Sequence, residues 1–305
     1  MNDPVVVLAG GTGGAKLARG LLDELGPDRL AVIVNTGDDI AAFGLHVSPD
    51  PDLVTFWLAD RIDERGWGLR GDTFHVMDGL RELGDDVWFN LGDRDLAIGV
   101  WRARRLDEGA RLTETIEHVA RTFDVPARVL PMCDEPVRTR VKAGGAWQGL
   151  QEFLIRSGGA GPIEDVELRG AEAARPTAEA LDVIAHARAI LVGPSNPVIS
   201  IDPILAVPGM REALRASPAP VVAVSPIVRG KILKGPTEAF LAWAGHPLSS
   251  DGIAAHYDGV IDGLVADEVA ESVPTLQVDV ELSDPASRRR VARETLRFAA
   301  ALREP

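Results

Sequence analysis

The sequence has one cysteine, few aromatic residues and no long apolar run. Cys133 cannot form a disulfide within the chain, and no group of cysteines and histidines has the spacing of a zinc site. No segment approaches about 18 uninterrupted apolar residues, and no basic region precedes an apolar run of signal length near the N-terminus. These absences exclude an intramolecular disulfide framework, and they lead us to expect a cytoplasmic protein without membrane contacts.

Positive charge is also scarce. The 32 Lys and Arg residues are outnumbered by 46 Asp and Glu residues, which gives a formal net charge of -14. A surface of this sign repels nucleic acids and anionic membranes, so we expect neither as a partner. An anionic small molecule could still bind where local hydrogen-bond donors or a metal ion offset the negative field. With 46% hydrophobic residues in 305 positions, the chain has enough apolar surface for a large globular core.

Short apolar runs alternate with helix-length segments along the chain. The runs VVVLAG, LAVIVNTG, DVWFNLG and ARVLP occupy the first half, and AILVGPSN, PVVAVSPI, GVIDGLVAD and LQVDVEL the second. Buried strands separated by helices are typical of βαβ units, so the pattern predicts a Rossmann-like α/β fold with a mainly parallel sheet and helices on both faces. We expect residues 1–305 to form one nucleotide-binding domain, in which ligands sit beyond the carboxyl ends of the strands.

Two stretches depart from this alternation and are predicted to be smaller elaborations. Residues 53–85 are expected to form two helices, the second capped by Asp72. Residues 137–170 contain the alternating run VRTRV and an AGGAW turn, which indicate a hairpin. The segment after LQVDVEL is predicted to be a closing helix with Pro285 in its first turn.

The stretch VVVLAGGTGGAKLARGLL predicts a strand, a glycine-rich turn and the start of a helix. Glycines let a ligand approach the backbone closely, and the free N–H groups of a helix N-terminus attract an anion. The dinucleotide fingerprint requires a third glycine where this chain has Lys16, and an ATP-type loop requires Ser or Thr after its lysine. A tight turn without a ligand remains the alternative. The candidate phosphate-binding residues are Gly11, Thr12, Gly13 and Gly14.

Carboxylates follow the second predicted strand. Asp38 and Asp39 of NTGDD offer the oxygen ligands that Mg²⁺ prefers when it joins a protein to a substrate phosphate. A cap for a following helix is the alternative interpretation. Asp50 lies in the segment VSPDPD, where Pro49 and Pro51 are expected to prevent a helix and to hold the carboxylate toward a ligand. An ordinary turn would explain the same segment.

Three later loops add polar side chains at the predicted edge of the sheet. Arg94 of LGDRDL can bind an oxyanion or the face of an aromatic ring, although it could instead pair with its two acidic neighbours. Ser195 and Asn196 of GPSNP offer a hydroxyl and an amide. The loop SPIVRGKILKGP adds basic groups, among them Lys234, that suit phosphate or base contacts. Structural turns are the alternative for either of the last two loops.

The number and order of these loops resemble the 2-phospho-L-lactate transferases of coenzyme F(420) biosynthesis, including their phosphoenolpyruvate-type relatives. The resemblance extends over nearly the whole chain and is carried by LAGGTGGAKLARGL, NTGDD, GLHVSPDPD, RGWGLRGDTFH, WFNLGDRDLA, GPSNPVISIDPIL and SPIVRGK. It implies a transferase that moves a phospholactyl or enolpyruvyl-phosphoryl group from a guanosine diphosphate-linked donor to the deazaflavin alcohol Fo. The hydroxyl of Fo would attack the phosphorus that bears the acyl group, and GMP would leave.

The resemblance also implies roles for individual residues. Asp38 would bind Mg²⁺ with help from Asp39, and it would act in catalysis together with Asp50. Asp50 and Arg94 match the positions at which the family contacts Fo. A homodimer is expected from the family. The donor's acyl group stays open between lactyl, enolpyruvyl and glyceryl, because the span 137–161 has no recognisable family feature. The residues facing the nucleotide and its phosphates would be Gly11, Thr12, Gly13, Gly14, Ser195 and Asn196.

Two other interpretations fit parts of the sequence. A sister family of regulatory nucleotide-sugar-binding proteins shares the glycine turn and a strand that ends in two aspartates. Its second loop differs from NTGDDIAAFGLHVSPD, and the downstream GDRD favours the transferase. A nicotinamide-dependent oxidoreductase would need the third glycine and a single ribose-binding acid after the second strand, where this chain has Asn35 and Thr36. The transferase is therefore the favoured interpretation.

Overall fold

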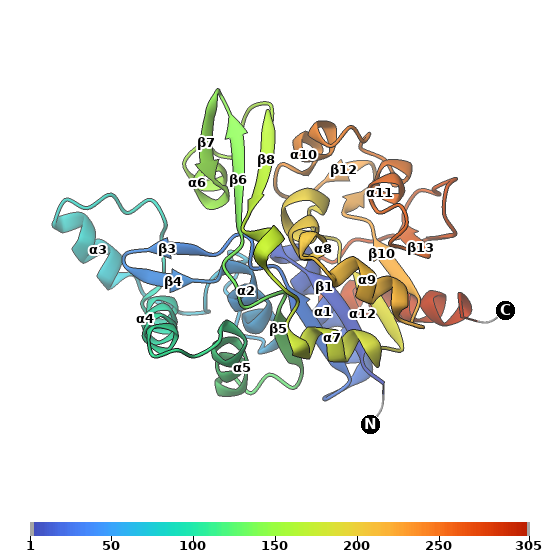
Figure 1. Ribbon diagram of the computed structural model, residues 1–305, viewed down its shortest axis with the longest axis horizontal. Coiled ribbons are helices and arrows are strands. Elements are labelled where there is room, and N and C mark those ends of the chain that lie inside the picture. Colours follow the sequence, from blue (N-terminus) through green and yellow to red (C-terminus); the bar gives the residue numbers. More distant parts are fainter. Residues whose placement is uncertain (1–2, 304–305) are drawn as a thin grey trace.

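The computed structural model describes residues 3–303, and its centre is a seven-stranded sheet (Figure 1). All neighbouring strands are parallel, in the order β14-β13-β10-β9-β1-β2-β5. The predicted α/β fold with a parallel sheet is therefore confirmed. The strands of this sheet are β1 (Val5–Ala9), β2 (Leu30–Val34), β5 (Arg128–Pro131), β9 (Ala189–Val192), β10 (Val221–Val224), β13 (Gly263–Ala266) and β14 (Thr275–Gln277).

Helices cover both faces of the sheet, which explains why its inner strands are apolar at every position. Val5 and Val7 of β1 pack into one core cluster, whereas Val6 and Leu8 point to the opposite face and pack into another. The first cluster joins the sheet to α1 (Gly11–Leu25), α2 (Pro49–Leu58), α5 (Leu112–Thr122) and α12 (Pro285–Ala301). The second joins it to α7 (Ala178–Ala185), α8 (Asp202–Ala206), α9 (Met210–Ala216), α10 (Thr237–Trp243) and α11 (Ser250–His256).

The order of the strands reverses next to β1. The chain passes from β1 outward to β2 and β5, and then returns to β9 on the other side of β1. The loops that follow β1 and β9 therefore leave the sheet at neighbouring points and in different directions. In open parallel sheets, ligands bind at such a reversal, beyond the carboxyl ends of the strands.

The segment between β2 and β5 corrects three predictions. It opens with an antiparallel hairpin of β3 (Ile40–Ala42) and β4 (Leu45–Val47). The following helix, α2, begins at Pro49, so the prolines do not prevent a helix. A proline in the first turn leaves no helical hydrogen bond unmade, because the first N–H groups of a helix have no partner within it.

Residues 87–91 were predicted to form a strand, but they do not belong to one. Phe89 and Leu91 pack against Ala42 and Val47 of the hairpin in a small apolar cluster of their own. A short apolar run alone does not distinguish a strand of the sheet from an irregular segment that packs against a hairpin.

Asp72 does not cap the helix that follows it, contrary to the prediction. The carboxylate of Asp72 accepts the backbone N–H of Arg94 at the start of α4 (Asp93–Asp107), at 3.1 Å. Conversely, Asp93 accepts the N–H groups of His75 and Val76 at the start of α3 (His75–Glu82). The start of α4 is thus capped by Asp72, which precedes α3, and the start of α3 is capped by Asp93, the first residue of α4, so the two caps hold both helix N-termini together.

The second elaboration stands above the central sheet in Figure 1 and contains the predicted hairpin. Its strands are β6 (Arg138–Ala143), β7 (Ala146–Gly149) and β8 (Asp165–Arg169), with antiparallel pairing on both sides of β6. The third strand was not predicted. A short helix, α6 (Leu150–Ile155), follows β7, and the single-turn element η1 (Ala171–Ala173) follows β8.

Two small elements complete the chain near the loops that follow β9 and β10. The π-helical turn η2 (Pro197–Ile201) precedes α8, and β11 (Ile227–Val228) pairs with β12 (Lys231–Ile232) in a short hairpin. The closing helix α12 has Pro285 at its first position, as predicted. Within residues 3–303, no helix combines the length and apolar character that a membrane span requires.

Candidate active site

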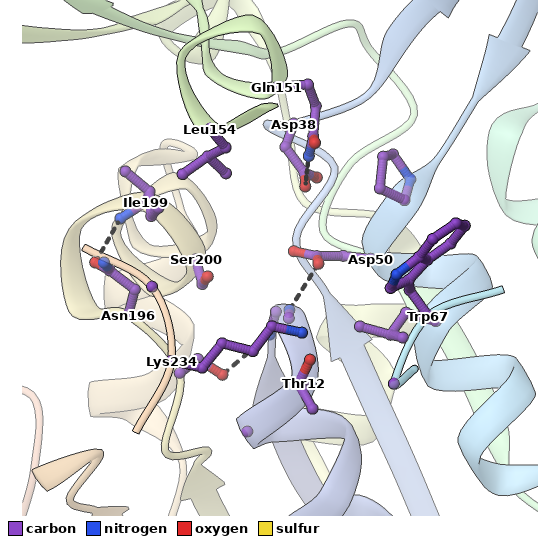
Figure 2. Close-up of a pocket in the computed structure, with 18 of the residues that line it drawn as sticks. Thr12, Asp38, Asp50, Trp67, Gln151, Leu154, Asn196, Ile199, Ser200 and Lys234 are labelled. Atoms are coloured by element: carbon purple, nitrogen blue, oxygen red, sulfur yellow. Dashed lines mark hydrogen bonds between the residues drawn. The ribbon is translucent and has the colours of Figure 1, made fainter. Parts of the chain in front are cut away.

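A cavity of about 740 Å³ opens at the carboxyl edge of the sheet, beside the reversal in strand order. Its lining comes from the ends of β1, β9 and β10, from α2 and α6, and from the segments 66–68 and 88–91. Both elaborations therefore contribute to its walls. Figure 2 shows Asp50 near the centre, with Asp38 and Gln151 on one side, Thr12 on another, and Trp67 across the cavity from Asn196.

The glycine-rich turn follows β1 directly and lines the cavity. Gly11, Thr12 and Gly13 are part of the lining, whereas Gly14 lies beneath the hydroxyl of Ser195. A side chain at Gly13 would overlap the carbonyl oxygen of Pro194. The glycines at these two positions therefore let the loop after β9 close onto the start of α1, so that the two loops form one surface.

The loop after β9 supplies Ser195 and Asn196, and both line the cavity. The hydroxyl of Ser195 accepts the N–H of Gly10 at 3.3 Å. The side-chain oxygen of Asn196 caps η2, where it accepts the N–H groups of Val198 and Ile199 at 3.0 and 3.2 Å. Asn196 thus has a structural task as well as a place in the wall of the cavity.

Asp38 and Asp50 both accept hydrogen bonds from the side-chain amide of Asn35. The Asn35 amide nitrogen donates to Asp50 Oδ2 at 3.0 Å and to Asp38 Oδ1 at 3.5 Å. The other oxygen of Asp50 accepts the backbone N–H of Gly11 at 2.6 Å. The other oxygen of Asp38 accepts the side-chain amide of Gln151 at 2.9 Å. Two carboxylates from distant segments are therefore fixed beside the glycine-rich turn.

Burial makes these carboxylates more basic than usual. The pKa of Asp50 is raised to about 6, mainly by desolvation, although hydrogen bonds from Asn35 and Gly11 oppose the shift. The pKa of Asp38 lies well above its ordinary value because of desolvation and the nearby charges of Asp50 and Asp39. A cation bound next to these carboxylates would stabilise their ionised forms and so lower their pKa values.

Asp39 has a different environment from Asp38. It does not line the main cavity, and its Oδ2 accepts the Ser48 hydroxyl and contacts His46 Nε2, each at 2.9 Å. These contacts attach the β3–β4 hairpin to the end of β2. The other oxygen of Asp39 is buried and has no hydrogen-bond partner in the described chain.

Arg94 is exposed and lies outside the lining of the cavity, whereas its neighbour Asp95 lines it. Positive charge in the lining comes instead from Lys16 and Lys234. The pKa of Lys16 is lowered, first by burial and then by the charges of Arg288 and Lys234. The cavity thus combines cationic and acidic groups around the glycine-rich turn.

Asn35, Gln151 and Asp95 are among the polar contributors that were not singled out from the sequence as site residues. Asn35 ends the second strand, so its place next to the aspartates could have indicated a role. Gln151 lies 113 positions from Asp38, and nothing in its local pattern marks it. Its contact depends on how the second elaboration folds over the sheet.

The doubly wound parallel sheet and the cavity at its carboxyl edge define a ligand-binding α/β protein of the Rossmann-like class. The family model described as 2-phospho-L-lactate transferase CofD matches residues 5–296. The chain therefore belongs to this transferase family, as its motifs predicted.

Individual relatives agree with the family match. A phosphoenolpyruvate transferase from Kitasatospora aureofaciens is 39% identical over 94% of this chain and 97% of its own length. A 2-phospho-L-lactate transferase from Methanosarcina mazei is 37% identical over 87% of each chain. A crystal structure of a UPF0052 family protein from Bacillus halodurans covers 97% of this chain with a TM-score of 0.63, at 18% identity. That last likeness shows the fold alone.

Proposed function

We propose that this protein transfers a phospholactyl or enolpyruvyl-phosphoryl group from a guanosine diphosphate-linked donor to the ribityl hydroxyl of Fo. The hydroxyl oxygen of Fo bonds to the phosphorus that bears the acyl group, the bond from this phosphorus to the bridging oxygen of the diphosphate breaks, and GMP leaves with that oxygen. The product is a phosphodiester. Its relatives include a phosphoenolpyruvate transferase and a 2-phospho-L-lactate transferase, which supports both kinds of donor.

The observation that carries this proposal is the position of Asp50. One of its oxygens accepts the N–H of Gly11 in the glycine-rich turn, and the other shares Asn35 with Asp38. The glycine-rich turn, where we place the phosphate, and the paired carboxylates are therefore in direct contact. A phosphorus atom held at the turn would lie next to a carboxylate that can receive the proton of an attacking hydroxyl.

Several residues of the cavity have tasks in this reaction. Thr12 and Gly13 hold the diphosphate with backbone and hydroxyl donors beside Gly11, whose own N–H donates to Asp50, while Lys16 and Lys234 balance the negative charge of the diphosphate. Asp50 orients the hydroxyl of Fo and accepts its proton, since a pKa of about 6 leaves it ionised yet basic near neutral pH. Ser195 and Asn196 lie toward the nucleotide, and Arg94 stays a predicted contact for Fo at the surface.

The residues present fit a requirement for Mg²⁺. Within residues 3–303, no three acidic, His or Cys side chains form a complete metal cage. Mg²⁺ commonly uses one or two carboxylates, with waters and substrate phosphates as its other ligands, so the desolvated carboxylate of Asp38, which lines the cavity and has no cationic partner in the described chain, suits it. Asp38 would hold the ion with Asp39 behind it, and the ion would supply charge stabilisation at the diphosphate.

The proposal is tested by incubating the protein with Mg²⁺, Fo and each donor separately, and following GMP and the phosphodiester by mass spectrometry. We expect product with at least one donor and a loss of about 100-fold in kcat for Asp38→Asn. Calorimetric titration with Mg²⁺ in the presence of GDP should show weaker metal binding in that variant. Asp107→Asn, which changes an exposed carboxylate of α4, is the matched control.

The alternative outcome is equally specific. Absence of GMP release with lactyl, enolpyruvyl and glyceryl donors, together with binding of a nucleotide sugar, would contradict the transferase and support a regulatory binding protein. Sedimentation of the same sample tests the expected homodimer.

A further inference from the structure

The cavity has an aromatic end that the proposed chemistry does not yet use. Trp67, Trp88, Phe89 and Phe56 all line the cavity. Phe74 connects three of these rings, because it lies edge-on to Trp67 and packs in one apolar cluster with Trp88 and Phe89. The guanidinium of Arg65 lies 4.3 Å from the centroid of Trp67, and the indole remains 38% exposed. A cavity wall of this kind accommodates a flat ring system by stacking and apolar contact.

One acidic group, Asp95, belongs to the same end of the cavity. Gly68, the neighbour of Trp67, lies so close that a side chain built on it would come within 3.2 Å of Asp95 Oδ2. Gly68 itself has a φ of 69°, which favours glycine, so the turn that holds Trp67 passes directly over the carboxyl group. The aromatic wall and the carboxyl are therefore adjacent.

The carboxyl of Asp95 has no partner in the described chain. No donor within residues 3–303 forms a hydrogen bond or ion pair with its carboxyl oxygens. Its backbone N–H donates to Asp72 Oδ2 at 3.3 Å. Its two acidic neighbours, in contrast, have partners within the protein. Asp52 is paired with the fully buried Arg102, and Asp72 caps α4. Asp95 is half-buried, and a partly desolvated carboxyl without a protein partner is available to a ligand that supplies one.

Partial burial and the neighbouring charges favour the protonated form of Asp95 below about pH 7. Desolvation, followed by the negative charges of Asp52 and Asp72, raises its pKa to about 7, and Arg65 and Arg102 only partly oppose this. As a neutral acid, the group offers one O–H donor and one C=O acceptor side by side. The imide edge of a pyrimidinedione has the complementary pair, an N–H next to a C=O.

We propose that Asp95 determines specificity for the acceptor by pairing as a neutral acid with the imide edge of the deazaflavin ring, which packs against Trp67. This inference rests on the proposed function, because it assumes that the acceptor is Fo. An ionised carboxylate would lose the donated hydrogen bond and would repel the imide oxygens. Asparagine at this position keeps a donor and an acceptor without titrating.

The test measures the dissociation constant of Fo from its fluorescence between pH 6 and 8.5, for the wild type, Asp95→Asn, Asp95→Ala and the control Asp107→Asn. We expect the wild type to bind about tenfold more weakly at the high pH, and Asp95→Asn to bind tightly throughout. Asp95→Ala should bind weakly at every pH. In turnover assays, the KM for Fo should follow these values, while the KM for the donor stays unchanged.

The outcomes separate this inference from the function on which it rests. If Asp95→Asn shows the same pH dependence as the wild type, or if Asp95→Ala binds Fo normally, Asp95 does not recognise the ring and the transferase proposal is untouched. A wild-type protein that binds no Fo at any pH would overturn both. Thermal unfolding tests whether each variant is folded. If Asp95→Ala does not fold, the pH dependence of Fo binding by Asp95→Asn decides whether Asp95 recognises the ring.

Discussion

At the residue scale, Asn35 joins the two acidic side chains of the cavity. Its amide donates to Asp38 and Asp50, while its own oxygen accepts the N–H of Gly37 at 2.7 Å. A single buried amide thus sets the distance between two carboxylates that would otherwise repel each other. The arrangement favours ligand binding over stability, because both carboxylates are desolvated and neither is paired with a cation in the described chain.

The pH dependence of stability should reveal this cost at Asp50. Its pKa is raised from 3.8 to about 6 on folding, so the folded protein holds the proton more tightly than the unfolded chain. The stabilisation from this group is complete below the unfolded value and is lost as the pH rises through about 6. Relative to the wild type, Asp50→Asn should therefore gain on the order of 2 kcal/mol between pH 4 and pH 8.

Urea denaturation of both proteins across this pH range measures the effect. A constant difference in the free energy of unfolding between Asp50→Asn and the wild type would show that the pKa of Asp50 does not shift on folding.

At the scale of elements, the N-terminus of α1 is held by the loop after β9. Gly13 and Gly14 bring the helix against Pro194 and Ser195 without space for side chains. The turn therefore has a packing role in addition to its proposed phosphate contacts. This explains why a structural interpretation of the glycines and a functional one both fit the sequence.

Replacing Gly13 by Ala should separate the loops. The new methyl group would meet the backbone of Pro194, so we expect a loss of about 1 to 3 kcal/mol in stability and weaker nucleotide binding. Gly79→Ala in α3 is the matched control, since nothing lies within 4 Å of its added carbon, and it should gain about 0.5 to 1 kcal/mol. Thermal unfolding and GDP titration measure both. Equal behaviour of the two variants would contradict close packing at Gly13.

At the scale of the whole molecule, the two elaborations meet at the mouth of the cavity. Arg156, directly after α6, contacts Asp86 at 2.5 Å and lies 5.0 Å from the ring centroid of Trp88. Trp88 and Ile155 both line the cavity. Insertions that are far apart in the chain therefore close the same opening.

Arg156→Ala should loosen this opening with little effect on global stability, because the pair is exposed and such pairs contribute less than about 1 kcal/mol. We expect faster amide exchange in residues 84–91 and 150–156. Arg297→Ala, which removes an exposed pair with Glu294 in α12, is the control. Unchanged exchange in Arg156→Ala would show that the two elaborations are held together by other contacts.

The sequence alone was sufficient for the sheet, the closing helix and the family. Inner strands buried on both faces are continuous apolar runs, and the loops after them carry polar residues that stay in order along the chain. These features are local, so they can be read from a window of residues. The same locality explains the error at residues 87–91, where an apolar run of strand length packs against a hairpin instead.

Only the tertiary structure decided which side chains face the cavity. Asp38 and Asp39 are adjacent in sequence, yet only Asp38 lines it, and the same holds for Asp95 beside Arg94. Side-chain direction depends on how β3 and α4 are oriented by their partners, and Gln151 reaches Asp38 only because the second elaboration folds over the sheet. The chain order of the motifs thus determined the family and the fold class, whereas packing between distant segments determined the composition of the site.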